Sequence, residues 1–389
     1  MTSFAKHGKA PLVAHIVFRF DYGGLENGVV NLINRMPESE FRHCVIALTE
    51  ASDFQMRIRK AGVTVYCLEK RPGKDLKVYL RLFRLVRRLK PAIVHTRNLG
   101  TLDCLFIAWL ARVPVRIHGE HGWDIYDPDG TNRKYRLLRR FMAPFIDRFV
   151  AVSDELAEWL VRRIKISETR IVRICNGVDT EKFHPREKAD REGLPAGIFP
   201  PDCVIVGSVT RFSAIKDPLN LVKSFICLDN KHEELVNSSR LLMIGSGELY
   251  AEAQTLVREA GLQNRAWLCG SRDDVPEMLR KMDVFVLGSL REGISNTILE
   301  AMASGLPVIA SATGGNLELI ADGETGELVP SSDPKALADA ISVYVSDAET
   351  RERHGRKARE RACSRFSLSV MVDSYHRLYR DALQRAGVD

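Results

Sequence analysis

Glu292 and Glu300 are two carboxylates whose spacing suggests chemistry, because a helix start is expected between them. The apolar run 283–287 predicts a strand, and helix-forming residues follow Ser295, so Glu292 lies on a loop and Glu300 within a helix. Ser295 or Asn296 can cap that helix, whose first amides then face the loop. Such a helix end holds a phosphate, and the neighbouring acids can accept hydrogen bonds from hydroxyls. A phosphate beside many hydroxyls indicates a nucleotide sugar.

Two cations, Arg211 and Lys216, follow a second predicted strand at residues 204–208. At the carboxyl end of a strand their best use is to neutralise a diphosphate leaving group, and the alternative is an ordinary surface pair. Glycine-containing loops end further strands at 245–247 and at 270–272. The second of these could frame a base through its backbone.

In the first half of the chain, Gly23 and Gly24 follow a strand predicted at residues 13–18. Adjacent glycines let backbone approach a ligand, although a plain turn is the alternative. The absence of G-x-G-x-x-G argues against a nicotinamide enzyme. His121 follows a strand predicted at 115–118 and could touch a sugar or carry a proton, with a structural role as the alternative.

Composition indicates a two-domain enzyme of a reducing compartment. The chain has 389 residues and is 45% hydrophobic, enough for two cores. Its eight cysteines are scattered without a C-x-x-C pair, which favours a cytoplasmic location. The N-terminus lacks the apolar core of a signal peptide, and no run approaches the ~20 apolar residues that span a bilayer.

The net charge of +7 is unevenly distributed. Residues 1–187 carry 33 basic and 21 acidic side chains, whereas residues 188–389 carry 24 and 29. The excess lies in two predicted helices, at positions Lys77, Arg81, Arg84 and Arg88 and at positions Arg133, Lys134, Arg136, Arg139 and Arg140. Basic helices can lie on anionic lipid, and a solvated helix face is the alternative. No recognition motif for nucleic acid accompanies these charges, so no nucleic-acid partner is expected.

Strands and helices alternate along the whole chain, which predicts two parallel, doubly wound sheets. The charged, proline-containing stretch 184–195 is the expected linker. Ligands of open parallel sheets bind at the carboxyl ends of the strands, so we expect the site in a cleft between the two domains. The predicted strands are residues 13–18, 43–48, 63–67, 92–95, 115–118, 149–152, 171–174, 204–208, 241–244, 267–269, 284–287, 308–310 and 327–329.

Together these residues resemble the retaining glycosyltransferases of family 4, which have the GT-B fold of two Rossmann-like domains facing across a cleft. The resemblance covers nearly the whole chain and includes the glycine pair, residues 176–185, the two cations and the two acids. Residues 22–28 and 120–124 are also similar to bacterial sugar transferases of exopolysaccharide clusters, including those linked to exosortase systems. The resemblance implies domains 1–186 and 187–365, with helices at 366–389 crossing back to the first domain.

The resemblance also implies a role for each candidate residue. Glu300 would accept hydrogen bonds from the ribose, and Glu292 would hold hydroxyls of the donor sugar. His121 would contact that sugar near its anomeric centre, while the two cations stabilise the diphosphate. Backbone groups would contact the phosphates, the sugar or the base at Gly23, Gly24, Ile294, Ser295, Asn296, Thr297, Gly270, Ser271 and Arg272. Many relatives have glycine where this chain has Asp217, just after the lysine, which affects fine positioning.

The expected reaction transfers a hexose from a nucleotide-diphosphate donor to a glycan or lipid-linked acceptor in cell-surface polysaccharide synthesis. Same-face displacement with retention, in which the diphosphate helps to deprotonate the acceptor, is preferred over a covalent intermediate on Glu292. No metal or other cofactor is expected, because the D-x-D at Asp127 to Asp129 consists of ordinary turn formers. A UDP-sugar is the default donor and GDP-mannose stays open. The enzyme would work in the cytoplasm, or peripherally at the inner face of the membrane.

Three alternatives stay open on the same architecture. An epimerase would convert the donor without an acceptor, and a phosphorylase would need inorganic phosphate. A non-catalytic sensor of nucleotide sugars would not need both acids and both cations.

Overall fold

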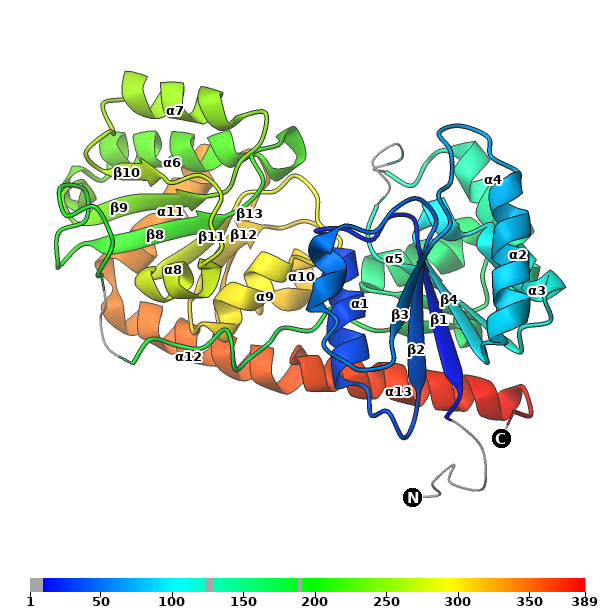
Figure 1. Ribbon diagram of the computed structural model, residues 1–389. Helices are drawn as coiled ribbons and strands as arrows, with labels where there is room; N and C mark the ends of the chain where they lie inside the picture. The colour runs from blue at the N-terminus through cyan, green and yellow to red at the C-terminus, as the bar shows by residue number, and fades with distance from the viewer. Residues whose placement is uncertain (1–9, 124–126, 128, 188–190, 389) are drawn as a thin grey trace. The chain divides into compact units, whose positions relative to one another are not determined.

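The computed structural model describes residues 10–123, 127, 129–187 and 191–388. Parts of four stretches considered above lie outside these residues: the N-terminal nine residues, Asp124 of the stretch 120–124, Pro128 of the D-x-D sequence, and positions 188–190 of the expected linker. The chain folds into two compact units, each described below by itself (Figure 1). Unit 1 comprises Met1–Asn176 and Leu368–Asp389, and unit 2 comprises Gly177–Ser367.

Unit 1 is built on a seven-stranded parallel sheet, because its strands are joined by helical crossovers. Its central strands are buried along nearly their whole length, as expected when both faces of a sheet are covered, although they include histidine, threonine and arginine. In sheet order the strands are β3 (Thr64–Cys67), β2 (Arg42–Ala47), β1 (Leu12–Val17), β4 (Ile93–Arg97), β5 (Val115–Glu120), β6 (Arg148–Ala151) and β7 (Ile171–Arg173).

The helices of unit 1 come from both ends of the chain. The C-terminal helix α13 packs with α1 over the sheet and supplies eight of the buried residues of one core cluster. The helices are α1 (Gly24–Arg35), α2 (Lys77–Leu89), α3 (Cys104–Leu110), α4 (Arg133–Met142), α5 (Asp154–Trp159) and α13 (Leu368–Arg385). Helix α5 changes after Trp159 into a π-helical turn, η4 (Leu160–Ile164).

A polar network lies inside this apolar core. His15 on β1 faces His95 on β4 in the strand register, and its Nε2 lies 2.9 Å from Nδ1 of His43 on β2. Nδ1 of His95 lies 2.9 Å from the hydroxyl of Tyr379 on α13. The guanidinium of Arg97 bonds to Nδ1 of His15 at 3.2 Å. The network therefore joins three strands to the last helix of the chain.

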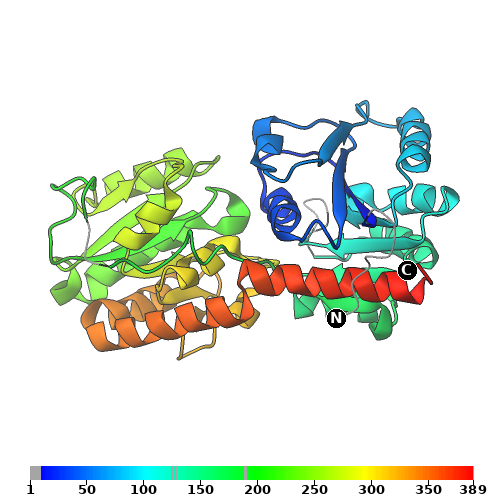
Figure 2. The same cartoon turned by 60° about the horizontal axis from the view of Figure 1, so that its bottom comes forward.

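Unit 2 repeats the architecture with a six-stranded parallel sheet. In sheet order its strands are β10 (Ala266–Leu268), β9 (Ser239–Ile244), β8 (Val204–Val209), β11 (Val284–Leu287), β12 (Val308–Ser311) and β13 (Gly326–Val329). Its helices are α6 (Pro218–Lys231), α7 (Tyr250–Glu259), α8 (Val275–Lys281), α9 (Asn296–Ala303), α10 (Asn316–Leu319), α11 (Pro334–Ser346) and α12 (Ala348–Arg365). Figure 2 shows α12 beside this sheet domain, and α6 and α11 share the main core cluster with the strands. The fold class expected from the sequence is confirmed.

The boundary between the units differs from the expected one, because the segment 177–186 packs within unit 2. The amide of Val178 donates to the carbonyl of Phe366 at 2.8 Å. Arg359 on α12 donates to the carbonyl oxygens of Thr180 and Phe183 at 2.9 and 2.8 Å. The chain therefore leaves unit 1 after Asn176, and returns at Leu368. The sequence predicted the linker at residues 184–195, because that stretch is rich in charged residues and contains proline. The hydrogen bonds that hold residues 177–186 in unit 2 cannot be recognised from composition.

Within the part of the chain that the structure describes, no helix combines the length and the apolar character needed to cross a bilayer.

The buried histidines of unit 1 predict loss of stability in mild acid. Burial, with the charge of Arg97, holds the pKa of His15 and of His95 well below its usual value, and burial lowers the pKa of His43 to about 3. These groups protonate near pH 6.5 only when unfolded. Unfolding therefore takes up protons, and stability is lost as the pH falls below about 6.5, by about 1.4 kcal/mol per pH unit for each such histidine.

Urea unfolding of the full chain between pH 8 and 5.5 measures this slope. We expect His43→Gln to remove about one proton from it, whereas His184→Gln, a partly exposed control in unit 2, leaves it unchanged. A free energy of unfolding that is flat with pH over this range would contradict the prediction.

Candidate functional site

Lys216 and Glu292 meet in unit 2, although 76 positions separate them in sequence. Nζ of Lys216 lies 2.5 Å from Oε1 of Glu292, and the hydroxyl of Ser289 donates to the same oxygen at 2.7 Å. The Glu292 side chain is only 6% exposed. A buried carboxylate of this kind needs a cation and hydrogen bonds to offset its lost hydration. The two residues therefore form an ion pair at the carboxyl ends of β8 and β11.

The backbone around Lys216 agrees with the glycine that the family resemblance implies for the next position. Lys216 ends a short 3₁₀ turn, η6 (Ala214–Lys216), and Asp217 adopts φ 44° and ψ 53° before α6 begins. This left-handed conformation favours glycine, and aspartate is among the few other residues that tolerate it. The departure from the family pattern thus preserves the turn that carries the lysine.

Glycines hold the neighbouring loops against the lysine loop. A side chain at Gly245 would meet the carbonyl oxygen of Thr210 at 1.8 Å, and one at Gly247 would meet that of Phe212 at 2.3 Å. Backbone bonds join the same loops, from the amide of Phe212 to the carbonyl of Ser246 at 2.9 Å. The loop 245–247 is therefore fixed directly beside the segment that carries Arg211 and Lys216.

The loop that carries Glu292 is fixed in the same way. A side chain at Gly315 would meet the carbonyl oxygen of Gly293 at 1.9 Å, and the amide of Gly315 donates to the carbonyl of Glu292. Gly315 is therefore a position of close backbone packing against the Glu292 loop.

Helix α9 begins where the sequence predicted. Ser295 is its N-cap, and its hydroxyl accepts from the amide of Ile298 at 3.3 Å. The first turn, with Asn296 and Thr297, thus follows the Glu292 loop directly. Glu300 lies in α9 and is partly buried. Burial raises the pKa of its carboxyl to about 7, while the nearby charge of Lys182 opposes the shift.

The other predicted residues of unit 2 occupy the same edge of the sheet. Arg211 is exposed, and within the described residues its guanidinium makes no hydrogen bond or ion pair. The carbonyl of Gly270 accepts from the amide of Gly245 at 2.8 Å, and the hydroxyl of Ser271 donates to Ser246 at 2.8 Å. Arg272 instead pairs with Asp274 at 2.6 Å, so its backbone rather than its charge is offered to a ligand.

In unit 1 the predicted glycine pair starts α1. Gly23 is the N-cap residue, with an extended backbone, and α1 begins at Gly24. A side chain at Gly23 would meet a carboxylate oxygen of Glu26 at 2.2 Å. Burial raises the pKa of Glu26, which was not predicted as a site residue. Gly23 therefore makes room for a carboxylate of the same turn.

His121 lies beyond the end of β5 and is held by an unpredicted residue, Asn98. The amide of His121 donates to Oδ1 of Asn98 at 2.7 Å. Asn98 itself has φ 57° and ψ 170°, a conformation that non-glycine residues rarely adopt and that often marks functional sites. Burial, together with the charge of Arg97, lowers the pKa of His121 to about 3. The imidazole is therefore neutral at pH 7, which favours a hydrogen-bonding role over that of a proton carrier.

Glu120, beside His121, makes a buried ion pair that the sequence did not indicate. Nε of Arg139 on α4 lies 2.6 Å from Oε1 of Glu120, and Nη2 lies 3.1 Å from Oε2. Burial would raise the pKa of Glu120, but Arg139 and His118 outweigh it and hold the pKa well below its usual range. The assignment of Arg139 to the exposed basic cluster is therefore wrong, because this residue is 4% exposed and faces inward.

Asp127, the first acid of the D-x-D sequence, is buried, and its carboxylate bonds to the backbone of the same chain. Its Oδ1 accepts from the amide of Asn132, the N-cap residue of α4, at 2.9 Å. Among the described residues, no group of three or more metal-ligand side chains comes together.

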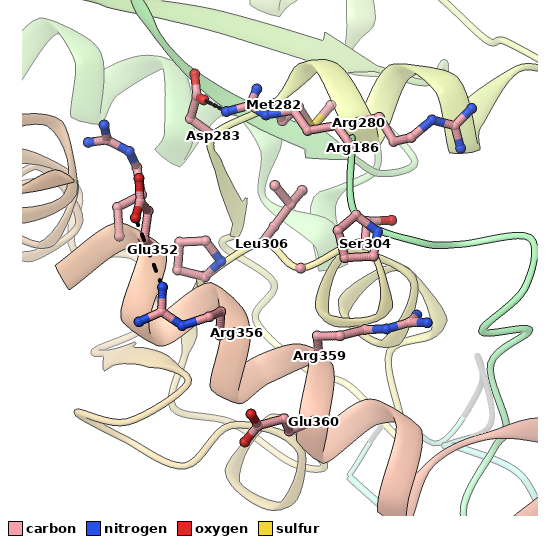
Figure 3. A pocket seen from close by; sticks show the side chains of 14 residues that line it. Arg186, Arg280, Met282, Asp283, Ser304, Leu306, Glu352, Arg356, Arg359 and Glu360 are labelled. Carbon is pink, nitrogen blue, oxygen red and sulfur yellow. Dashed lines mark hydrogen bonds and ion pairs between the residues drawn. The ribbon is translucent and has the colours of Figure 1, made fainter. Parts of the chain in front are cut away.

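A cavity of about 530 Å³ lies at the opposite edge of the unit 2 sheet, before β11 and β12. Several arginines line it, but Figure 3 shows Arg356 and Arg359 pointing in opposite directions along α12. Arg186 pairs with Asp283 at 2.6 Å, and Arg359 donates to the carbonyl of Ala303 at 2.6 Å. These guanidinium groups are therefore bonded to groups of the same chain, and they do not converge on the cavity.

Comparison with known proteins now decides the family. The model of Glycosyltransferase Family 4 matches residues 22–182, and that of Glycosyl transferases group 1 matches residues 195–361. EpsD of Bacillus subtilis (strain 168), which is named as a glycosyltransferase, is 30% identical over 79% of this chain and 81% of its own. The chain belongs to the family 4 glycosyltransferases.

A second relative of this glycosyltransferase matches almost end to end. The UDP-Gal:alpha-D-GlcNAc-diphosphoundecaprenol alpha-1,3-galactosyltransferase of Escherichia coli is 29% identical over 95% of this chain and 96% of its own. Among solved structures, a glycosyltransferase from Rickettsia africae ESF-5 has a TM-score of 0.81 at 21% identity, covering 97% of this chain and 100% of its own. Anabaena HepE in complex with UDP has a TM-score of 0.79 at 17% identity, over 95% of this chain and 100% of its own. The two structures share the fold of the glycosyltransferase.

The contact between Lys216 and Glu292 makes a prediction that separates stability from activity in this glycosyltransferase. Lys216→Met leaves a buried carboxylate without its cation, so we expect urea unfolding to show a loss of about 1–3 kcal/mol. The double variant Lys216→Met/Glu292→Gln removes both charges and should recover most of that loss without recovering activity.

Lys231→Met is the matched control, because Lys231 also lies 2.5 Å from a carboxylate, that of Asp339, but on the exposed surface. Its effect should stay below about 1 kcal/mol. A double variant as unstable as Lys216→Met alone would contradict the assignment.

Proposed function

We propose that this glycosyltransferase moves a sugar from a nucleotide-diphosphate donor to a glycan or lipid-linked acceptor, with retention, in cell-surface polysaccharide synthesis. The observation that carries the proposal is the Lys216–Glu292 contact beside the start of α9, because it places a cation, a carboxylate and helix amides at one edge of the sheet. A diphosphate joined to a sugar needs these three groups.

Each group has a role in the proposed reaction. Breaking the bond between sugar and diphosphate develops negative charge on the leaving oxygen, which Arg211, Lys216 and the α9 amides stabilise. The two described bonds to Glu292 both fall on Oε1, so its Oε2 can accept from a hydroxyl of the donor sugar. Glu300 accepts from the ribose, and the backbone at 270–272 frames the base. His121, neutral and oriented by Asn98, donates or accepts at the sugar.

The surroundings of Glu292 favour same-face displacement over a covalent intermediate. An ammonium and a hydroxyl both bind its Oε1, and both draw charge from the carboxylate and so make it less nucleophilic while holding it in place. We therefore assign Glu292 to orienting the donor, and the departing diphosphate to taking the proton of the acceptor.

The name of one relative supports a choice of first candidates for the donor and the acceptor. The name of the Escherichia coli relative specifies a UDP-sugar and a diphosphoundecaprenol-linked acceptor. Uridine diphosphate donors and a lipid-linked acceptor are therefore the first candidates, with GDP-mannose as the alternative donor. A lipid-linked acceptor also agrees with peripheral association of the basic unit 1 at the inner face of the cytoplasmic membrane.

Direct transfer assays test the proposal. Purified protein is incubated with UDP-galactose, UDP-glucose, UDP-N-acetylglucosamine or GDP-mannose, with and without a short-chain diphosphate-linked GlcNAc acceptor. We expect one donor to give a mass increase of one hexose unit on the acceptor, with the donor's anomeric configuration kept in the NMR spectrum of the product. Conversion of the donor without acceptor would indicate an epimerase, and dependence on inorganic phosphate a phosphorylase.

We further propose that transfer needs no metal, because the Asp127 carboxylate serves the start of α4. The same assay in EDTA should then run at an unchanged rate. Loss of turnover that manganese restores would contradict this part of the proposal.

The raised pKa of Glu300 predicts that nucleotide affinity rises with pH. Below about pH 7 this carboxyl is largely protonated, and a ribose that donates to its carboxylate must displace the proton. We expect the affinity for UDP to rise roughly tenfold from pH 6 to pH 8, with a proton released on binding.

Calorimetry of UDP binding, in buffers of different ionisation enthalpy, measures both quantities. Glu300→Gln should bind more weakly at pH 8, and its affinity should be the same at the two pH values. An affinity of the parent protein that is independent of pH would argue against contact between Glu300 and the ribose.

A further inference from the structure

Large apolar side chains are exposed on one side of unit 1. Phe141 and Leu137 on α4 are 69% and 57% exposed, and Trp109 and Leu110 at the end of α3 are each 46% exposed. Single exposed apolar residues are ordinary, but a contiguous group marks an interaction surface.

Aromatic contacts make this group contiguous. The ring of Phe145, in the turn η3 (Ala143–Phe145) after α4, lies 6.4 Å from that of Phe141 and 5.1 Å from that of Trp109. Phe106 stacks on Trp109 at 5.7 Å and packs edge-on against Phe145 at 5.0 Å. We call the surface formed by Leu137, Phe141, Phe145, Trp109 and Leu110 the aromatic patch.

Cations lie on a helix that carries the aromatic patch and on a helix that packs beside it. Helix α4 contains five basic residues and no acidic one, and apart from Arg139 they stay at or near the surface. Helix α2, which packs against α3, also contains five basic residues and no acidic one, of which Arg81 pairs with Asp75 at 2.9 Å. Figure 1 shows α2, α3 and α4 together on one side of unit 1.

We propose that the aromatic patch inserts into the interface of an anionic lipid bilayer, with the surrounding cations on the lipid headgroups. Tryptophan, phenylalanine and leucine beside arginine and lysine are the residues that favour this depth of a bilayer. A second copy of the chain is a poorer occupant, because a symmetric contact would bring the same cations of two copies together. The inference deepens the membrane association proposed above and rests on it.

The buried Glu120–Arg139 pair sets which face of α4 is presented. Arg139 points inward to the end of β5, so Leu137 and Phe141, two positions to either side of it, point outward. His121 directly follows Glu120 at the end of that strand. A bilayer held by the aromatic patch would therefore be fixed relative to His121 through one ion pair.

Vesicle flotation tests the proposal with the full-length protein. Vesicles of phosphatidylethanolamine and phosphatidylglycerol at 3:1 are compared with neutral phosphatidylcholine vesicles, at 100 mM and 500 mM NaCl. We expect binding to the anionic vesicles, and a drop of roughly tenfold or more in the partition coefficient for Leu137→Ser/Phe141→Ser. Met56→Ser, at a side chain in unit 1 that is 80% exposed, is the matched control and should bind unchanged.

Two readouts separate insertion from mere attraction. Trp109 should shift its fluorescence to the blue and be quenched by brominated lipid, and Trp109→Phe should remove both signals. Arg133→Gln/Lys134→Gln/Arg140→Gln should weaken binding mainly at low salt, whereas the Leu137 and Phe141 variant stays weak at both salt concentrations.

Equal binding of Leu137→Ser/Phe141→Ser and the parent protein would overturn the proposal. So would a concentration-dependent dimer of the parent protein that this variant abolishes, because a second copy would then occupy the patch. Transfer to a water-soluble acceptor should be the same in this variant and the parent. If no variant transfers sugar, the proposed function fails, while the flotation result still decides the role of the patch.

Discussion

A buried carboxylate that must be neutralised by a lysine from another loop is the constraint on which the candidate site depends. Glu292 is almost inaccessible to water, so its charge is tolerated only where Lys216 and Ser289 can reach it. The loops that carry these groups have to approach within hydrogen-bond distance. Gly245, Gly247 and Gly315 stand where no Cβ would fit between the loops. The glycines and the ion pair therefore act together. The glycines lack a Cβ and so allow the loops to approach each other, and the opposite charges of Lys216 and Glu292 hold the loops together.

Unit 1 also buries polar side chains in its core, and most of them are neutral imidazoles. His15, His43 and His95 lie in the middle of an apolar sheet, with Arg97 as the buried cation among them. Each imidazole bonds to a neighbour through one ring nitrogen, and the hydroxyl of Tyr379 links the network to α13, while Nε2 of His43 and of His95 has no hydrogen-bond partner among the described residues. Polar interiors of this kind are stable only when their groups find partners, so they specify one arrangement of strands and helix.

The strands could be predicted from the sequence because buried parallel strands are short apolar runs between breakers. Residues 284–287, for example, coincide with β11. Glu292 and Lys216 could be named as candidates, because both follow such runs at the edge where ligands bind. Their contact could not be predicted, since it depends on the three-dimensional order in which β8 lies beside β11. Arg139 looked like one more surface cation for the same reason, because its partner Glu120 ends a distant strand.

Some features have no local signature at all. The positive φ of Asn98 is fixed by the groups around it. Nothing in the sequence distinguishes this asparagine from others that follow a strand. By contrast, the conformation of Asp217 could have been inferred, because the family resemblance implies glycine there. The end of unit 1 was misplaced since charge and proline mark a flexible stretch, whereas hydrogen bonds to α12 decide where residues 177–186 belong.

The return of the chain to unit 1 at Leu368 has a consequence for biosynthesis. Eight buried residues of α13 follow the whole of unit 2 in the sequence, so they are synthesised after it. Unit 2 can close its core during translation, but the first unit to be made is the last to be finished. Until α13 is synthesised, one apolar face of its sheet lacks this cover, so the N-terminal half stays open to chaperones and to aggregation while unit 2 is made.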